Sequence, residues 1–210
     1  MALTSYADLK AAIGTWNVNR ADLPAADLVA LAEARLNRDL RLRTMQAEQP
    51  LTATIGSRYV ALPTGFLEPL GLWINQGGGR CALRFVAADM ETSGAAGQPR
   101  RWTVDGANLA FERPCDQAYS LTLRMLQGFA LSDLSPTNWL LANDPDAYLA
   151  AANIEAALWL MDDEQATRWQ ARYADALGSI NIREARSGSM TTLDLDAGLR
   201  PPRTFDIITG

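Results

Sequence analysis

The chain has 210 residues, of which 48% are hydrophobic and 20% charged, a composition typical of a globular protein with a hydrophobic core. Its net charge is −5, so we do not expect it to clamp DNA, because a general grip on phosphates depends on lysine and arginine. It contains no histidine, which excludes the Ser-His and Cys-His nucleophiles of many hydrolases.

The sequence predicts neither a membrane protein nor a secreted one. It has no run of about 18 apolar residues. Its first ten residues lack a basic segment followed by an apolar stretch. The two cysteines, Cys81 and Cys115, are far apart and fit no metal-ligand spacing. We interpret them as reduced thiols in a protein of the cytoplasm.

Residues 1–48 are predicted to form two helices. Ser5 and Asp8 have the spacing of a capping box, and apolar residues follow at helical spacing to about residue 17. Pro24 opens a second helix that has leucines along one face. Charged residues, including Arg35 and Arg38, occupy most of its remaining surface, which we interpret mainly as a solvated face.

The pattern changes after Gln49 and Pro50, and residues 51–128 are predicted to be rich in β structure. Several short segments alternate between apolar and polar residues in the manner of strands. The glycines within residues 76–80 and the segment 105–108 are typical of hairpin turns. We therefore expect a β-rich region between two helical halves.

Residues 132–182 carry the clearest helix signals. Asp144 fits an N-cap and Pro145 the first helical position. Between Tyr148 and Met161 almost every residue is apolar, so this helix has to be covered on more than one side. A central core helix, a subunit interface, or both would satisfy that requirement.

Residues 183–210 differ from the rest of the chain. Composition alone favours a disordered tail, but its apolar content is high for pure disorder. A tail of this kind can become ordered on another chain, for example by adding a strand to a partner's sheet. The apolar residues are Leu193, Leu195, Leu199, Phe205, Ile207 and Ile208.

No motif for catalysis, cofactor binding or metal binding is found. The sequence has no Walker loop, dinucleotide fingerprint or Gly-x-Ser-x-Gly elbow. Acidic residues cluster late in the chain, and most of them stand at helix starts, where capping explains them without a metal. These acidic residues are Asp144, Asp146, Glu155, Asp162, Asp163 and Glu164.

The predicted fold class is α+β: an antiparallel-like helical bundle, an inserted β-rich subdomain and an extended C-terminal tail.

Several short motifs follow one another over residues 4–180. They are SYADLK at 5–10, LAEARLNR at 31–38, LP at 62–63, GQPRRWTVDG at 97–106, PTNWLL at 136–141, PDAYL at 145–149 and DDE at 162–164, followed by Trp169 and Tyr173. Their order and spacing resemble the adaptor proteins of tailed phages, also called head–tail connector or head-completion proteins.

The resemblance implies a structural virion protein at the interface between capsid and tail, made in the host cytoplasm. Such adaptors form a dodecameric ring under the portal vertex, extend the DNA channel and let DNA pass without specific binding. Residues 24–42 and 145–177 would build the ring wall, with the helix at 145–161 covered by its own fold on one side and by a neighbouring subunit on the other. The β region would face a tail or nozzle protein.

The resemblance also suggests residues for these interfaces. Tyr148, Trp159, Arg35 and Arg38 would lie at subunit contacts, and the six apolar residues of the tail would bind the portal protein. No cofactor and no membrane are implied.

Two alternatives remain open at this stage. One is a metal-dependent nuclease or another phage enzyme, which would need a metal-dependent activity that Asp144→Ala or Glu155→Ala abolishes. The other is a monomeric assembly scaffold, which would never form a ring.

Overall fold

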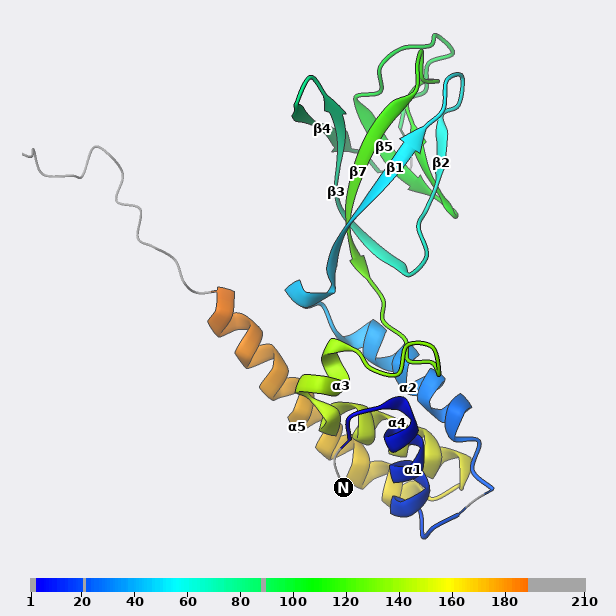
Figure 1. The fold of residues 1–210 in the computed structure, drawn as a ribbon, viewed down its shortest axis with the longest axis vertical. Helices are drawn as coiled ribbons and strands as arrows, with labels where there is room; N and C mark the ends of the chain where they lie inside the picture. Colours follow the sequence, from blue (N-terminus) through cyan, green and yellow to red (C-terminus); the bar gives the residue numbers. More distant parts are fainter. Residues whose placement is uncertain (1–2, 21, 88–89, 189–210) are drawn as a thin grey trace, which may run out of the picture.

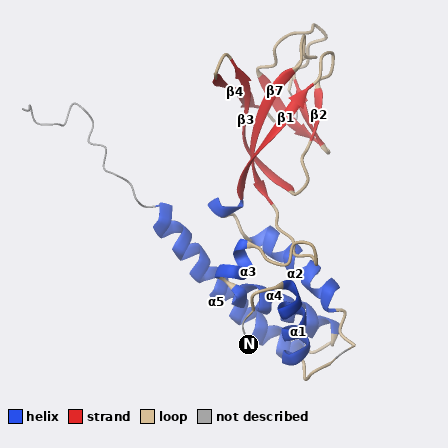
Figure 2. Ribbon diagram, in the orientation of Figure 1, coloured by secondary structure: helices blue, strands red, loops and turns tan. Residues whose placement is uncertain are grey.

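The computed structural model describes residues 3–20, 22–87 and 90–188, which form two lobes joined by short connections (Figure 1). Helices make up one lobe and strands the other (Figure 2). In chain order the elements are α1 (Tyr6–Trp16), α2 (Ala25–Asp39), η1 (Arg43–Met45), β1 (Gln46–Ala53), β2 (Tyr59–Ala61), β3 (Phe66–Gln76), β4 (Gly79–Phe85), β5 (Arg101–Asp105), β6 (Asn108–Phe111), β7 (Tyr119–Gln127), α3 (Trp139–Asn143), α4 (Pro145–Trp159) and α5 (Asp163–Gly188).

The strands form one seven-stranded sheet in the order β1-β7-β3-β4-β5-β6-β2. All neighbours are antiparallel except β4 and β5, which pair in parallel over a short stretch. β1 pairs with β7 along its whole length, although the two strands lie far apart in the sequence. The chain therefore enters and leaves the β lobe through two hydrogen-bonded strands.

Alternating side chains give this sheet a core of its own. Leu72 on β3 lies opposite Leu123 on β7, and both are buried. Trp102 on β5 is also buried, and its indole N–H donates to the carbonyl oxygen of Leu83 at 3.3 Å. The period-two pattern of the sequence thus points one face of each strand into a single interior.

The predicted fold class, a helical bundle with an inserted β-rich subdomain and an extended tail, is wrong. The chain forms a barrel-like sheet of seven strands accompanied by a few helices. The strands are not separate hairpins attached to helices, because long-range pairs such as β1 with β7 and β2 with β6 join them into one sheet around its own core. Such pairings depend on contacts between distant residues, which local patterns do not reveal.

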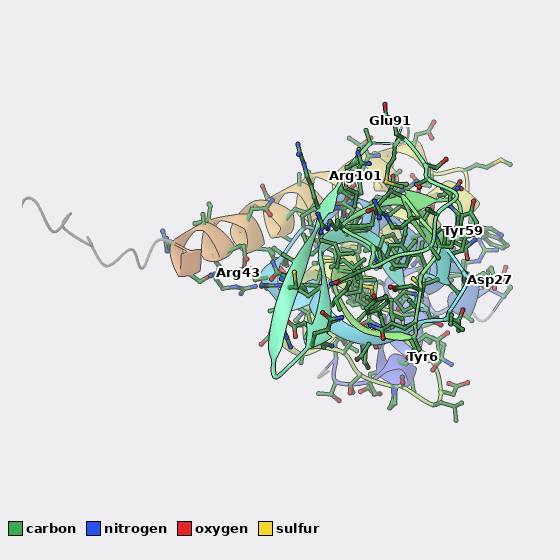
Figure 3. All side chains as sticks on the ribbon, turned by 90° about the horizontal axis from the view of Figure 1, so that it is seen from above. Tyr6, Asp27, Arg43, Tyr59, Glu91 and Arg101 are labelled. Carbon is green, nitrogen blue, oxygen red and sulfur yellow. The ribbon has the colours of Figure 1, made fainter. Side chains whose placement is uncertain are left out.

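The prediction that an extended tail begins at residue 183 is also wrong. Residues 183–188 are helical and continue α5 to Gly188. Two contacts hold this end of the helix: Arg183 bonds the carboxylate of Asp144, and Arg43 Nε donates to Glu184 Oε1 at 2.8 Å. Arg43, labelled in Figure 3, lies beside the part of α5 that projects from the molecule. The rest of the predicted tail, residues 189–210, lies outside the described residues.

Helix α4 is the centre of the helical lobe. Ten of its fifteen residues are buried, many of them alanines whose small side chains allow close packing. It packs against α1, α2, α3 and α5 of the same chain. The expectation that a neighbouring subunit covers one side of α4 is therefore wrong for the ten buried residues between Ala147 and Ala157, because the chain buries them itself.

A buried polar network ties α4 to the segment that returns from the sheet. The hydroxyl of Tyr148 donates to Glu33 Oε1 at 3.1 Å and accepts from Asn138 Nδ2 at 2.6 Å. The same Glu33 oxygen accepts from the N–H of Leu131 at 2.6 Å. Burial raises the pKa of the Glu33 carboxyl, although these hydrogen bonds favour its charged form.

This network predicts a pH-dependent effect of Glu33→Gln. Because the pKa of Glu33 is raised in the folded chain, protonation of Glu33 stabilises the folded state. This stabilisation is fully present below the pKa that Glu33 has in the unfolded chain, and it is lost as pH rises through the pKa that Glu33 has in the folded chain. A neutral glutamine has no such loss. We expect the free energy of unfolding of the variant, relative to the unmodified chain, to increase from about pH 4 to about pH 7 in urea titrations. A difference that stays constant, or that decreases with pH, would contradict this account.

Candidate interaction site

Five exposed apolar side chains lie at or just beyond the ends of α1 and α4. We name this group the apolar tip; its members are Trp16, Val18, Leu158, Trp159 and Met161. A groove of about 280 Å³ runs between the two helix ends, lined in part by Trp16, Val18 and Leu160. Single exposed apolar residues are ordinary, but a cluster that contains two tryptophans beside a groove is typical of a binding surface.

Two members of the apolar tip have a strained backbone. Val18 has φ of 62° and Met161 has φ of 56°, which places both in the left-handed region. This region costs an L-residue about 1–2 kcal/mol, and for a β-branched residue such as valine it is a true outlier. Yet Val18 is 89% exposed and Met161 91% exposed, so neither side chain gains packing within the subunit.

The end of α4 explains the conformation of Met161. The N–H of Asp162 donates to the carbonyl oxygen of Ala157 at 2.9 Å, which closes the helix around a left-handed residue. Glycine is the usual residue at such a position because it has no Cβ. Here a methionine occupies it and exposes a long apolar side chain.

The base of the apolar tip is well anchored. Trp16 packs edge-on against Trp169 of α5, with ring centroids 5.4 Å apart, and the guanidinium of Arg172 lies over both rings. Asn17 Nδ2 donates to Oδ1 of the buried Asn153 at 2.7 Å. Asn153, a polar residue within the apolar sequence of α4, thus holds the end of α1 in place.

The predicted interface residues fall in different places. Trp159 is half-exposed within the apolar tip. Tyr148 is fully buried in the network with Glu33, so its side chain cannot contact another subunit without unfolding. Arg35 pairs with Glu155 at 2.6 Å, and Arg38 lies exposed on α2. The six predicted residues of the tail lie outside the described residues.

The acidic residues of the late helices make structural contacts. Asp144 pairs with Arg183, Glu155 pairs with Arg35, and Asp162 Oδ1 accepts from the N–H of Gln165 at 3.0 Å as a helix cap. In residues 3–20, 22–87 and 90–188, no group of three or more histidines, cysteines or acidic residues could hold a metal ion. None of the helices described there has the length and apolar character needed to cross a membrane.

Comparison with known families then decides the class of this protein. A family model described as SU10 adaptor protein matches residues 4–194. The chain belongs to the SU10 adaptor protein family. It is therefore a structural adaptor of phage particles, and the resemblance noted in its motifs is confirmed. No curated protein gives a significant match.

Sequence reasoning found only one residue of the apolar tip in this adaptor, Trp159. Val18 directly follows the first predicted helix, and Met161 is the last residue of the helix predicted at 145–161, close to where a glycine or asparagine would be expected. A large apolar residue directly after a helix end is the signal that could have indicated the surface.

Replacing Met161 by glycine is expected to stabilise the isolated adaptor subunit. The substitution removes left-handed strain and loses almost no packing, so we expect the free energy of unfolding to rise by about 0.5–1 kcal/mol in urea titrations, after the extra chain entropy of glycine is counted. The matched control is Met161→Ala, which removes the side chain but keeps the strain and should give no gain. If Met161→Gly is destabilising, the methionine packs within the subunit and the interpretation of strain fails.

Proposed function

We propose that this protein forms the adaptor ring that connects the portal vertex of a phage capsid to the tail and extends the DNA channel. The observation that carries the proposal is the apolar tip, in which Val18 and Met161 have strained backbones and exposed side chains. A subunit that functioned alone would gain nothing from this arrangement. Burial against another subunit would offset the strain, because apolar surface removed from water contributes about 25 cal/mol per Å².

The apolar tip is suited to a contact between ring subunits. Tryptophan and methionine are enriched in interface cores, and tryptophans are often the residues that dominate binding energy. Arg20 lies 6.0 Å from the ring of Trp159 and forms an ion pair with Asp22, which gives the apolar tip a polar margin. An apolar centre with a polar rim is the usual anatomy of a specific interface.

The C-terminal part of α5 is suited to direct the arm that follows it towards a partner. Arg183 and Glu184 are bonded to Asp144 and Arg43, so the helix keeps one direction where it leaves the helical lobe. Residues 189–210 then carry the six apolar residues predicted to bind the portal protein. The β lobe, at the opposite end of the molecule from the apolar tip, would contact the tail or nozzle protein (Figure 1).

The charge of the chain supports passage of DNA rather than binding. A net charge of −5 gives a ring built from many copies a strongly negative total charge. DNA held only by phosphate contacts would therefore find little attraction in the channel. The protein would be a virion component at the interface between capsid and tail, assembled there after synthesis in the host cytoplasm.

Ring formation should depend on the apolar tip, although the stability of the isolated subunit does not require it. We expect Met161→Gly to lower ring formation on portal-bearing capsids about tenfold at limiting protein concentration, the effect of losing one interface anchor. Bound copies per capsid can be counted by co-sedimentation and electron microscopy. The exposed Ile55→Gly on the β lobe is the matched control, since it removes a comparable apolar side chain far from the apolar tip. Equal ring formation by both variants would contradict a role for the apolar tip.

Portal binding should depend on the arm. A chain that ends at Gly188 keeps all the described elements and is expected to fold with unchanged circular dichroism. It should lose sedimentation with portal-bearing capsids, whereas the full chain sediments with them. Undiminished recruitment of the shortened chain would show that the portal is bound elsewhere on the protein.

A further inference from the structure

Strand β4 has an unpaired edge at its beginning. β4 pairs with β3 through a two-residue turn at Gly77 and Gly78, so the main-chain groups of alternate residues point away from β3. Arg84 has this outward orientation, because its N–H donates to the carbonyl oxygen of Arg100 at 2.9 Å on the other side. By the same alternation, Arg80 and Ala82 point their N–H and C=O groups outward, and no described strand pairs with them there.

The two faces of this edge differ in chemistry. Arg80, Ala82 and Arg84 share one face and are exposed. Cys81 and the buried Leu83 share the other face, which continues the core side of the sheet. Arg80 forms an ion pair with Glu48 at 3.0 Å, whereas Arg84 has none within the part of the chain that the structure describes. The edge therefore offers one basic face, one apolar face and two sets of free main-chain groups.

The arm of the chain contains a short segment with the complementary pattern. In residues 192–196 the order is Thr-Leu-Asp-Leu-Asp, so an extended backbone would place both leucines on one face and both aspartates on the other. We propose that residues 192–196 of a second copy of this chain add a strand to the β4 edge, so that only the later apolar residues of the arm, Leu199, Phe205, Ile207 and Ile208, are left to bind the portal protein. This inference rests on the proposed ring, since it joins one subunit to the next.

One antiparallel register matches both faces. Leu195 lies opposite Cys81 and Asp196 opposite Arg80, and Leu193 continues along the apolar face to the point where Arg100 takes over the edge of β4. Asp194 then faces Ala82, diagonal to Arg80 and Arg84, within reach of their long side chains. In this register the outward groups of Arg80 and Ala82 exchange hydrogen bonds with the added strand, and Cys81 occupies a pair in which side chains approach closely.

The direction of α5 favours a second copy as the donor of this strand. Figures 1 and 3 both show the end of α5 projecting to one side, clear of the β lobe of the same chain. Only residues 189–191 separate that end from the proposed strand, and three residues span about 10 Å at most. We therefore assign the receiving edge to a second copy in the proposed ring. Strand addition of this kind takes affinity from main-chain bonds and selectivity from alternate side chains.

Cys81 provides a direct test, because it is exposed on β4 whereas the other cysteine, Cys115, is buried. The full chain carrying Leu195→Cys is assembled on portal-bearing capsids and treated with a mild oxidant. We expect covalent oligomers linked through Cys81 and position 195, resolved on a non-reducing gel and identified by peptide mass. The matched control is Asp194→Cys, which places the thiol on the opposite face and should give about tenfold less product, because disulfides tolerate little misalignment. Cys81→Ser in the Leu195→Cys chain should abolish the product.

Each outcome decides between the inference and its alternatives. A protein that sediments with capsids but gives no cross-link, or gives equal cross-linking at positions 194 and 195, overturns the strand pairing while the proposed ring stands. A disulfide within one chain also overturns it, because the strand would then pair with its own sheet. If no variant sediments with capsids and the unmodified chain does not either, the proposed function fails and this inference fails with it.

Discussion

The complete burial of α4 within a single chain is the constraint on which the rest of the structure depends. A helix this apolar has to be enclosed, and helices α1, α2, α3 and α5 enclose it. Its polar groups are satisfied inside the subunit: Asn153 bonds Asn17, and the hydroxyl of Tyr148 lies between Glu33 and Asn138. Since a buried polar group without partners is costly, these bonds also fix how the surrounding elements are placed.

Because α4 is enclosed by its own chain, its buried middle is not available for assembly, whereas the ends of α1 and α4 are exposed. The apolar tip forms where α1 and α4 stop, and it is there that Val18 and Met161 adopt left-handed backbones. At the other end, Arg43 and Asp144 hold the last turns of α5 and fix where the arm begins. Strain that brings no benefit inside a subunit is often found at functional sites, and here it supports an assembly role.

The sequence was sufficient for the local structure and for the family. The helix starts at Ser5 and Pro145 and the turns at residues 77–78 and 106–107 are confirmed, because each depends on a few neighbouring residues. The sheet as a whole was not predictable in this way. Pro50 suggested a break, but it lies within β1, which is an edge strand whose outer side needs no partner for a missing N–H.

The candidate site was less predictable than the fold. An apolar helix can be covered by its own chain or by a neighbour, and composition does not distinguish the two. The prediction of an interface at Tyr148 is wrong because its side chain is buried, and the left-handed φ angle of Met161 is not visible in a sequence. The interface at Trp159, predicted on the same resemblance, stays a prediction for a half-exposed side chain.

The central claim is that each subunit completes α4 by itself and assembles through the apolar tip. Amide hydrogen exchange, compared between the free full-length subunit and the protein in assembled particles, tests this directly. The account predicts that residues 147–157 are already protected in the free subunit, and that assembly adds protection at residues 16–20 and 158–162. Protection of residues 147–157 that arises only on assembly, with no change at the apolar tip, would contradict it.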